Sequence, residues 1–187
     1  ETFASRTAIR FSATPGSSTF VDLIAPRVRE VVLNGQSLDP AEVFADSRIQ
    51  LDGLEAQNEL VVLADAAYMN TGEGLHRFVD PVDDEVYLYS QFEVADSRRV
   101  FAVFEQPDLK AAFTFRVTAP AHWVVVSNYP AIGEPVPVEG GRNLNGGRDQ
   151  GTATWTFETT PRISSYITAV VAGPYHSEHG ELTSSDG

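Results

Sequence analysis

Short runs in which apolar and polar residues alternate recur along most of this chain. Residues 7–12 read TAIRFS, and residues 19–24 and 112–118 follow the same rule. Successive side chains of a β-strand point to opposite faces, so the alternation predicts strands that bury one face. About ten such segments follow one another at a spacing of roughly 8–15 residues. The sequence therefore predicts an all-β fold, a large antiparallel, saddle-like β-sandwich.

Turn residues and apolar runs add detail to this expectation. Asn34-Gly35 is a favoured two-residue hairpin turn. Residues 123–127 are continuously apolar, which predicts a strand covered on both faces, and residues 164–172 predict a last long strand. Residues 139–151 are rich in Gly and Asn and predict a mobile loop, across which residues 152–158 pair back as a hairpin.

One segment favours a helix over a strand. Residues 96–104 read DSRRVFAVF, and Asp96 or Ser97 could cap their start. The apolar face of this short helix would contain Val100, Phe101 and Phe104.

Composition excludes several classes of function. The formal net charge is −13, from 26 acidic and 13 basic residues, which disfavours binding to nucleic acid or to anionic membranes. The chain contains no cysteine, so thiol catalysis, disulfides and thiolate metal sites are excluded. No apolar run approaches the length of a membrane span, and no signal-peptide pattern is present. We expect a cytoplasmic location.

The residues that most often carry chemistry form no recognisable catalytic or metal site. His176 and His179 are three positions apart, but a helix is disfavoured there and a strand would point them to opposite faces. His76 and His122 are isolated in the sequence. Neither a zinc-binding H-E-x-x-H nor a G-x-S-x-G nucleophile motif occurs. We expect no catalytic residue, no metal ligand and no cofactor in this chain.

The segment Val86 to Glu93, VYLYSQFE, stands apart. With a period of two, Val86, Leu88, Ser90 and Phe92 form a core face, and Tyr87, Tyr89, Gln91 and Glu93 form the opposite one. An aromatic strip that ends in an amide and a carboxylate is suited to a ligand that is partly polar and partly apolar.

Two other interpretations of this strip stay open. The first is a non-catalytic β-sandwich module that binds glycan or protein, with Tyr87, Tyr89 and Trp123 as platforms. The second is a structural spacer whose exposed sheet face has no ligand.

The longer stretch from Tyr87 to Phe113 resembles a family pattern, T/S-Q-F/C-E followed by A-R-x-x-F-P-C-F-D-E-P-x-x-K-A-x-F. This pattern belongs to the amino-terminal domain of the aminopeptidase N family, which are zinc aminopeptidases of the gluzincin type. Among its members, the actinobacterial ones are the most similar in residue usage, which agrees with the single lysine of this chain. The matching residues are Ser90, Gln91, Phe92, Glu93, Arg98 or Arg99, Phe101, Phe104, Pro107, Lys110, Ala111 and Phe113. Residues 68–78 and 159–175 are similar to two further family segments.

The chain departs from the pattern at two places. Ala102 and Val103 replace Pro-Cys, and Glu105-Gln106 replaces Asp-Glu, which we interpret as packing and charge variants.

The resemblance implies that this chain binds the substrate and that residues outside this sequence carry out catalysis. Residues 1–187 would be a single amino-terminal β domain, without the family's first strands and without the catalytic domain. The parent protein would be a zinc aminopeptidase of the membrane alanyl aminopeptidase type, and this chain alone would be inactive. Its partners would be peptide N-termini and the catalytic domain of the same chain, which would hold Zn²⁺. Glu93 would bind the substrate's α-ammonium group, and Gln91 would line the pocket for the first side chain.

Overall fold

The computed structural model describes residues 1–140, 151–178, 180, 181, 183 and 184. Strands dominate, all of them paired antiparallel, so the predicted all-β class is confirmed. The strands are β1 (Thr2–Ser12), β2 (Thr19–Asp22), β3 (Arg27–Leu33), β4 (Gln36–Leu38), β5 (Phe44–Ala45), β6 (Arg48–Leu51), β7 (Gln57–Ala67), β8 (Gly74–Val79), β9 (Val86–Gln91), β10 (Arg116–Pro120), β11 (Val124–Ser127), β12 (Val136–Val138), β13 (Thr152–Thr156) and β14 (Val170–Gly173). The helical turns are α1 (Pro40–Val43), η1 (Ser97–Arg99) and η2 (Ser165–Ile167).

The first half of the chain builds two sheets around one core. The four-stranded sheet has the order β1-β7-β3-β4 and the three-stranded sheet the order β2-β6-β5. β1 and β7 pair along their whole length of 11 residues. Asn34 and Gly35, at φ 52° and 79°, form the predicted hairpin turn between β3 and β4. The core between these sheets is aliphatic and contains Val21, Leu23, Val31, Ile49, Leu51 and Leu60.

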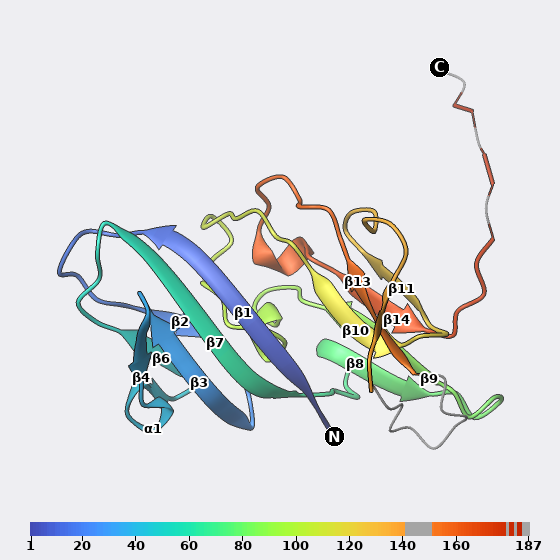
Figure 1. Ribbon diagram of the computed structural model, residues 1–187, viewed down its shortest axis with the longest axis horizontal. Helices are drawn as coiled ribbons and strands as arrows, with labels where there is room; N and C mark the ends of the chain where they lie inside the picture. The colour runs from blue at the N-terminus through green and yellow to red at the C-terminus, as the bar shows by residue number, and fades with distance from the viewer. Residues whose placement is uncertain (141–150, 179, 182, 185–187) are drawn as a thin grey trace.

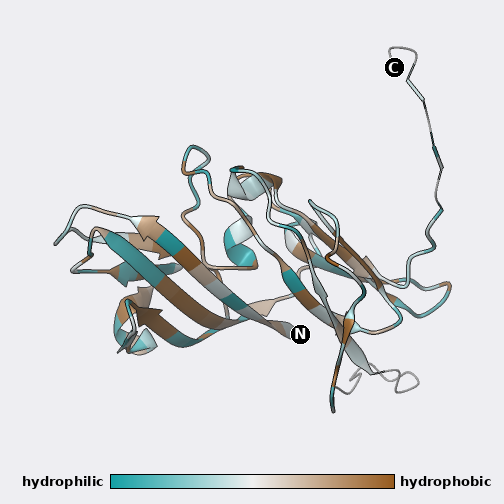
Figure 2. Ribbon diagram, turned by 45° about the horizontal axis from the view of Figure 1, so that its top comes forward, coloured by the Kyte–Doolittle hydropathy of each residue, from teal (hydrophilic) through white to brown (hydrophobic). Residues whose placement is uncertain are grey.

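The second half builds two more sheets around a second, more aromatic core. Their orders are β11-β14-β9-β8 and β10-β13-β12, the latter including the predicted hairpin partner of residues 152–158. The core contains Leu75, Leu88, Trp123, Val125, Trp155 and Phe157. Figure 1 shows the two halves side by side, with β1–β7 at one end and β8–β14 at the other. In Figure 2, hydrophobic and hydrophilic bands alternate along the long strands of the first half.

The segment predicted as a helix over 96–104 joins the two halves. Only Ser97–Arg99 is helical, as a 3₁₀ turn, because the following residues pack in two directions. Val100 packs against the second core, whereas Phe104 packs against the first, where its ring lies 5.0 Å from that of Phe11. Val103 exchanges two backbone hydrogen bonds with Asp22 of β2, at 2.8 and 3.0 Å. The expected common apolar face of Val100, Phe101 and Phe104 is therefore wrong.

Three strand predictions need correction, two in their extent and one in the number of covered faces. The strand expected over 112–118 begins only at Arg116. The strand at 123–127 is covered on one face only, because Val126 is 52% exposed. The strand expected over 164–172 is a 3₁₀ turn followed by β14. Most of the predicted mobile loop 139–151 lies outside the described residues.

Candidate functional site

The period-two division of the strip is confirmed along β9. Val86, Leu88 and Phe92 are buried, while Tyr89, Gln91 and Glu93 are exposed. β9 lies between β14 and β8, so its position and direction are fixed on both sides. Its hydrogen-bond ladder ends at Gln91, which pairs with Gly74 at the start of β8. The candidate site, formed by Gln91 and Glu93, thus lies at the end of a strand that has a neighbouring strand on each side.

Phe92 determines where its two polar neighbours point. Its side chain is 2% exposed, and its ring meets that of Phe101 edge-on at 5.7 Å. Phe101 in turn contacts Phe113 and Phe115, at 6.3 and 6.0 Å between ring centroids. Because Phe92 is held inward by this aromatic cluster, Gln91 and Glu93 are both turned outward.

Gln91 and Glu93 also contact each other. The backbone N–H of Glu93 donates to Oε1 of Gln91 at 2.5 Å, which fixes the amide and tightens the turn after β9. Within the described part of the chain, no ion pair or hydrogen bond engages the carboxylate of Glu93. An outward carboxylate without a protein partner is available to a cationic ligand.

The turn that carries Glu93 is held from its far side by η1. Nε of Arg98 donates to the carbonyl of Ala95 at 2.8 Å. The Glu105 carboxylate accepts hydrogen bonds from the hydroxyl of Ser97, from the backbone N–H of Arg98 at 2.8 Å and from the hydroxyl of Ser165 at 2.9 Å. It therefore joins η1 to η2.

Glu105 is a residue that the sequence reasoning underrated as a charge variant. The available signal was an acidic side chain in an apolar segment, eight positions after a serine that proves to be fully buried.

The outward face of β8 and β9 is lined with aromatic rings. Tyr89 stacks on His76 with 4.6 Å between ring centroids, and Tyr87 meets Tyr175 edge-on at 5.0 Å. Phe78, opposite Tyr87, is 44% exposed. We call Phe78, Tyr87, Tyr89 and Tyr175 the aromatic face. Together with Asp80 and His176 they line a shallow depression next to the candidate site.

Two tyrosines of this face have shifted pKa values. The hydroxyl of Tyr87 donates to Oδ2 of Asp83 at 2.8 Å. Ionisation would break this hydrogen bond and place two negative charges together, which raises the pKa of Tyr87 to about 12. Burial raises the pKa of Tyr175. Both phenols are therefore neutral hydrogen-bonding groups at ordinary pH.

The other candidate residues lie elsewhere or have different roles. Trp123 is 8% exposed in the second core and cannot act as a binding platform, so that part of the glycan-module interpretation is wrong. His76 accepts a hydrogen bond from the backbone of Gly72 through Nδ1 at 3.0 Å. His176 is exposed and lies near Glu178, and His179 is outside the described residues. Among the described residues, no three His, Asp or Glu side chains come close enough together to hold a metal ion.

Fold and site together define a β domain that presents a carboxylate and an amide at the end of one strand. The chain belongs to the Peptidase M1 N-terminal domain family, whose model matches residues 49–167. That range includes the whole candidate site.

Several curated relatives support this membership. Aminopeptidase N of Streptomyces lividans is 58% identical over 180 residues, which cover 95% of this chain and 19% of the relative. Aminopeptidase N of Acetobacter pasteurianus is 40% identical over 50% of this chain and 23% of its own length. Aminopeptidase Q of Mus musculus is 32% identical over 79% of this chain and 23% of its own length. The chain thus spans about a fifth of the length of these relatives. None of the helices in the described residues is long and apolar enough to cross a membrane.

Proposed function

We propose that this chain is the substrate-docking domain of a zinc-dependent aminopeptidase that removes N-terminal residues from peptides. Glu93 binds the α-ammonium group of the peptide, and Gln91 lines the pocket for the first side chain. The observation that carries the proposal is the outward pair at the end of β9, fixed by the buried Phe92 and free of an ionic partner among the described residues. Membership of a peptidase family agrees with this role.

The chemistry of a peptide N-terminus fits a carboxylate in this place. An α-amine has a pKa of about 8 and is largely protonated near neutral pH. A charge-assisted hydrogen bond from the ammonium group to a carboxylate contributes about 1.5–3 kcal/mol when water is excluded. Such a contact fixes the peptide's first residue at a set distance from the reacting bond, so that a single residue is removed.

The zinc ion and the groups that activate water belong, in this proposal, to the remainder of the parent protein. The described residues do not fit a zinc site, because their histidines are dispersed and no group of three ligands converges. We expect the chain alone to cleave no peptide. The cytoplasmic location expected from the sequence stays a prediction.

The aromatic face is the surface against which we place the catalytic part. Phe78 and Tyr89 are 44% and 41% exposed, and they share a sheet face with Gln91. Glu93 can reach a reacting centre only if another part of the protein covers this face. Aromatic side chains are enriched in buried interfaces, which agrees with such a contact.

The proposal is tested by Glu93→Ala in the full-length protein. Removing the ammonium contact lowers kcat/KM for an aminoacyl reporter roughly 10- to 150-fold, the equivalent of the 1.5–3 kcal/mol above. Because Glu93 is exposed, stability changes by less than about 0.5 kcal/mol. Steady-state kinetics and thermal unfolding measure the two effects.

Glu30→Ala is the matched control, since Glu30 is an exposed glutamate on β3 in the other half of the chain. Its kinetics should equal those of the unmodified enzyme. An unchanged kcat/KM for Glu93→Ala would remove the proposed anchor.

A further inference from the structure

Arg99 occupies a central place behind the turn that carries Glu93. We propose that Arg99 is a positioning residue that holds this turn, and with it the Glu93 carboxylate, in the geometry needed to bind the substrate's amine. This inference rests on the proposed function of Glu93 and extends it to a residue that does not touch the substrate.

Arg99 forms ion pairs on both sides of the site. Nε of Arg99 lies 2.7 Å from Oδ1 of Asp96, and Nη2 lies 2.8 Å from Oε2 of Glu73. Asp96 follows Glu93 by three residues along the turn. Glu73 immediately precedes Gly74, the cross-strand partner of Gln91. One guanidinium group thus connects the turn after β9 to the start of β8.

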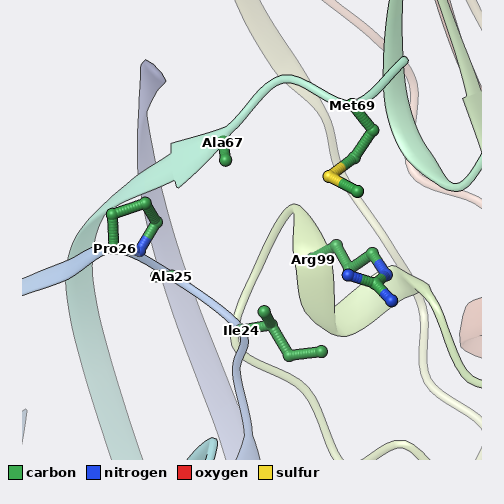
Figure 3. Close-up of a pocket in the computed structure, with 6 residues that line it drawn as sticks. All are labelled: Ile24, Ala25, Pro26, Ala67, Met69 and Arg99. Atoms are coloured by element: carbon green, nitrogen blue, oxygen red, sulfur yellow. The ribbon is translucent and has the colours of Figure 1, made fainter. Parts of the chain in front are cut away.

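The stem of Arg99 packs against the same strand start. A Cβ atom at Gly74 would lie 2.9 Å from Cβ and 3.2 Å from Cδ of Arg99, and Gly74 has a φ of +60°. A side chain at this position would displace the arginine. Figure 3 shows Arg99 extending from η1 into a pocket that it shares with Met69 and Ile24. Packing therefore restricts the stem while the two carboxylates fix the head group.

The turn needs such support because the strand ladder does not reach it. After Gln91 no cross-strand pairing is present until the isolated bridge at Val103, within the described residues. Val94 is 57% exposed and adds little packing. The side chains of Arg99 and Asp96 are only 25% and 23% exposed, so their ion pair is less screened by water than a pair on the open surface.

The guanidinium geometry suits this role better than an ammonium group would. Its planar fork donates in two directions at once, here to two carboxylates from different segments. A lysine at the same position could satisfy one acid fully but would not hold both in a fixed orientation. The conservative variant therefore gives a graded test.

The experiment compares Arg99→Gln, Arg99→Lys and Glu93→Ala in the full-length enzyme. Two probes are used, an amino-acid hydroxamate and the same hydroxamate without its α-amino group. Small misplacement of a binding group costs up to about a hundredfold, so we expect Arg99→Gln to weaken binding of the amine-bearing probe about tenfold. Binding of the probe without the amine stays unchanged. KM for an aminoacyl reporter rises by a similar factor, and Arg99→Lys lies between Arg99→Gln and the unmodified enzyme.

Arg29→Gln is the matched control, because Arg29 pairs with Asp65 in the first half of the chain. It should leave both probes and KM unaltered. Equal weakening of both probes by Arg99→Gln would mean general damage to the domain and would overturn the proposal. So would unchanged binding of the amine-bearing probe.

Glu93→Ala separates this inference from the function on which it rests. If Glu93→Ala does not weaken the amine-bearing probe, the proposed function itself fails. If Glu93→Ala weakens it and Arg99→Gln does not, only the role of Arg99 fails. Should Arg99→Gln not fold, Glu73→Gln and Asp96→Asn replace it, each with an expected loss of a few-fold for the amine-bearing probe alone. Unchanged binding in both would then overturn the role of Arg99.

Discussion

The two halves of the molecule reach order by different means. In the first half, long ladders such as that of β1 and β7 hold much of the chain, and the core is aliphatic. In the second half, residues 92–115 contain no strand, and the part around the candidate site is held largely by side chains, namely the aromatic cluster around Phe101, the ion pairs of Arg99 and the hydrogen bonds that Glu105 accepts. The candidate site lies in this second kind of structure. The paired strands of the first half hold their residues in strand geometry. Side-chain contacts in the second half can instead direct functional groups away from that geometry.

The halves are nevertheless firmly joined. Asp22 and Val103 exchange two backbone hydrogen bonds, and the backbone N–H of Ile24 donates to the carbonyl of Arg98 at 2.7 Å. Near the chain start, the ring of Phe3 lies 4.9 Å from that of Tyr68, and both pack against the second core. We therefore expect the halves to unfold together.

Leu60→Ala tests this coupling and has the largest expected effect. Leu60 is fully buried in the first core, so its truncation lowers the free energy of unfolding by about 2–5 kcal/mol. Both tryptophans, Trp123 and Trp155, lie in the second core. If the halves unfold as one unit, the tryptophan fluorescence transition moves by as much as the far-UV circular dichroism transition.

Leu109→Ala is the control for this variant, since Leu109 is 51% exposed and its truncation costs less than about 0.5 kcal/mol. A fluorescence transition that stays in place while the circular dichroism transition moves would show that the halves unfold separately.

A pair of glycine variants sharpens the comparison at the level of the backbone. Gly53, in the first half, and Gly74, in the second, have φ of +63° and +60°, where an alanine is strained. A Cβ at Gly53 meets nothing within 4 Å, whereas one at Gly74 meets Arg99 at 2.9 Å. We expect Gly53→Ala to cost about 1 kcal/mol and Gly74→Ala about 2–3 kcal/mol, measured by urea unfolding. Equal costs would mean that Arg99 yields easily and does not brace the strand.

The regular half is also the half that the sequence predicted best. Alternation identified β1 through residues 7–12 and β2 through residues 19–24, and Asn34-Gly35 identified a turn whose φ values few other residues adopt. In the second half, periodicity predicted the structure less well. Val100, Phe101 and Phe104 have helical spacing, but tertiary contacts with two separate cores draw them apart, and such contacts leave no mark in local periodicity.

In the candidate site, too, the sequence predicted the placement of some residues and not of others. The outward direction of Gln91 and Glu93 followed from the alternation of β9, because the buried residues beside them are strongly apolar. Arg99 and Glu105 could not be placed, because their partners Glu73 and Ser165 lie far away in the sequence. The roles of Gln91 and Glu93 in binding came from a family resemblance and stay predictions.

Alkaline titration gives the smallest effect and reports on the second half alone, because all six tyrosines lie at position 68 or later. Tyr87 titrates at about pH 12 in the folded protein, against about 10 in an unfolded chain. Because the folded-state pKa is the higher one, the hydrogen bond to Asp83 stabilises the fold fully below pH 10. That contribution disappears as the pH rises from about 10 to about 12. Tyr87→Phe therefore removes the last step of the phenolate absorbance titration.

Asp83→Asn is the sharper variant, because it keeps the phenol and removes only the neighbouring charge. We expect it to move the titration of Tyr87 from about 12 toward the ordinary value. An unchanged last step would mean that the Asp83 carboxylate is not its cause. The exposed fraction of the Tyr89 side chain, 41%, makes Tyr89→Phe a suitable reference on the same face, expected to leave the last step in place. If Asp83→Asn acts as expected, the hydrogen bond between Tyr87 and Asp83 is present in the folded protein, a side-chain contact comparable to the one that we propose for the turn beside Glu93.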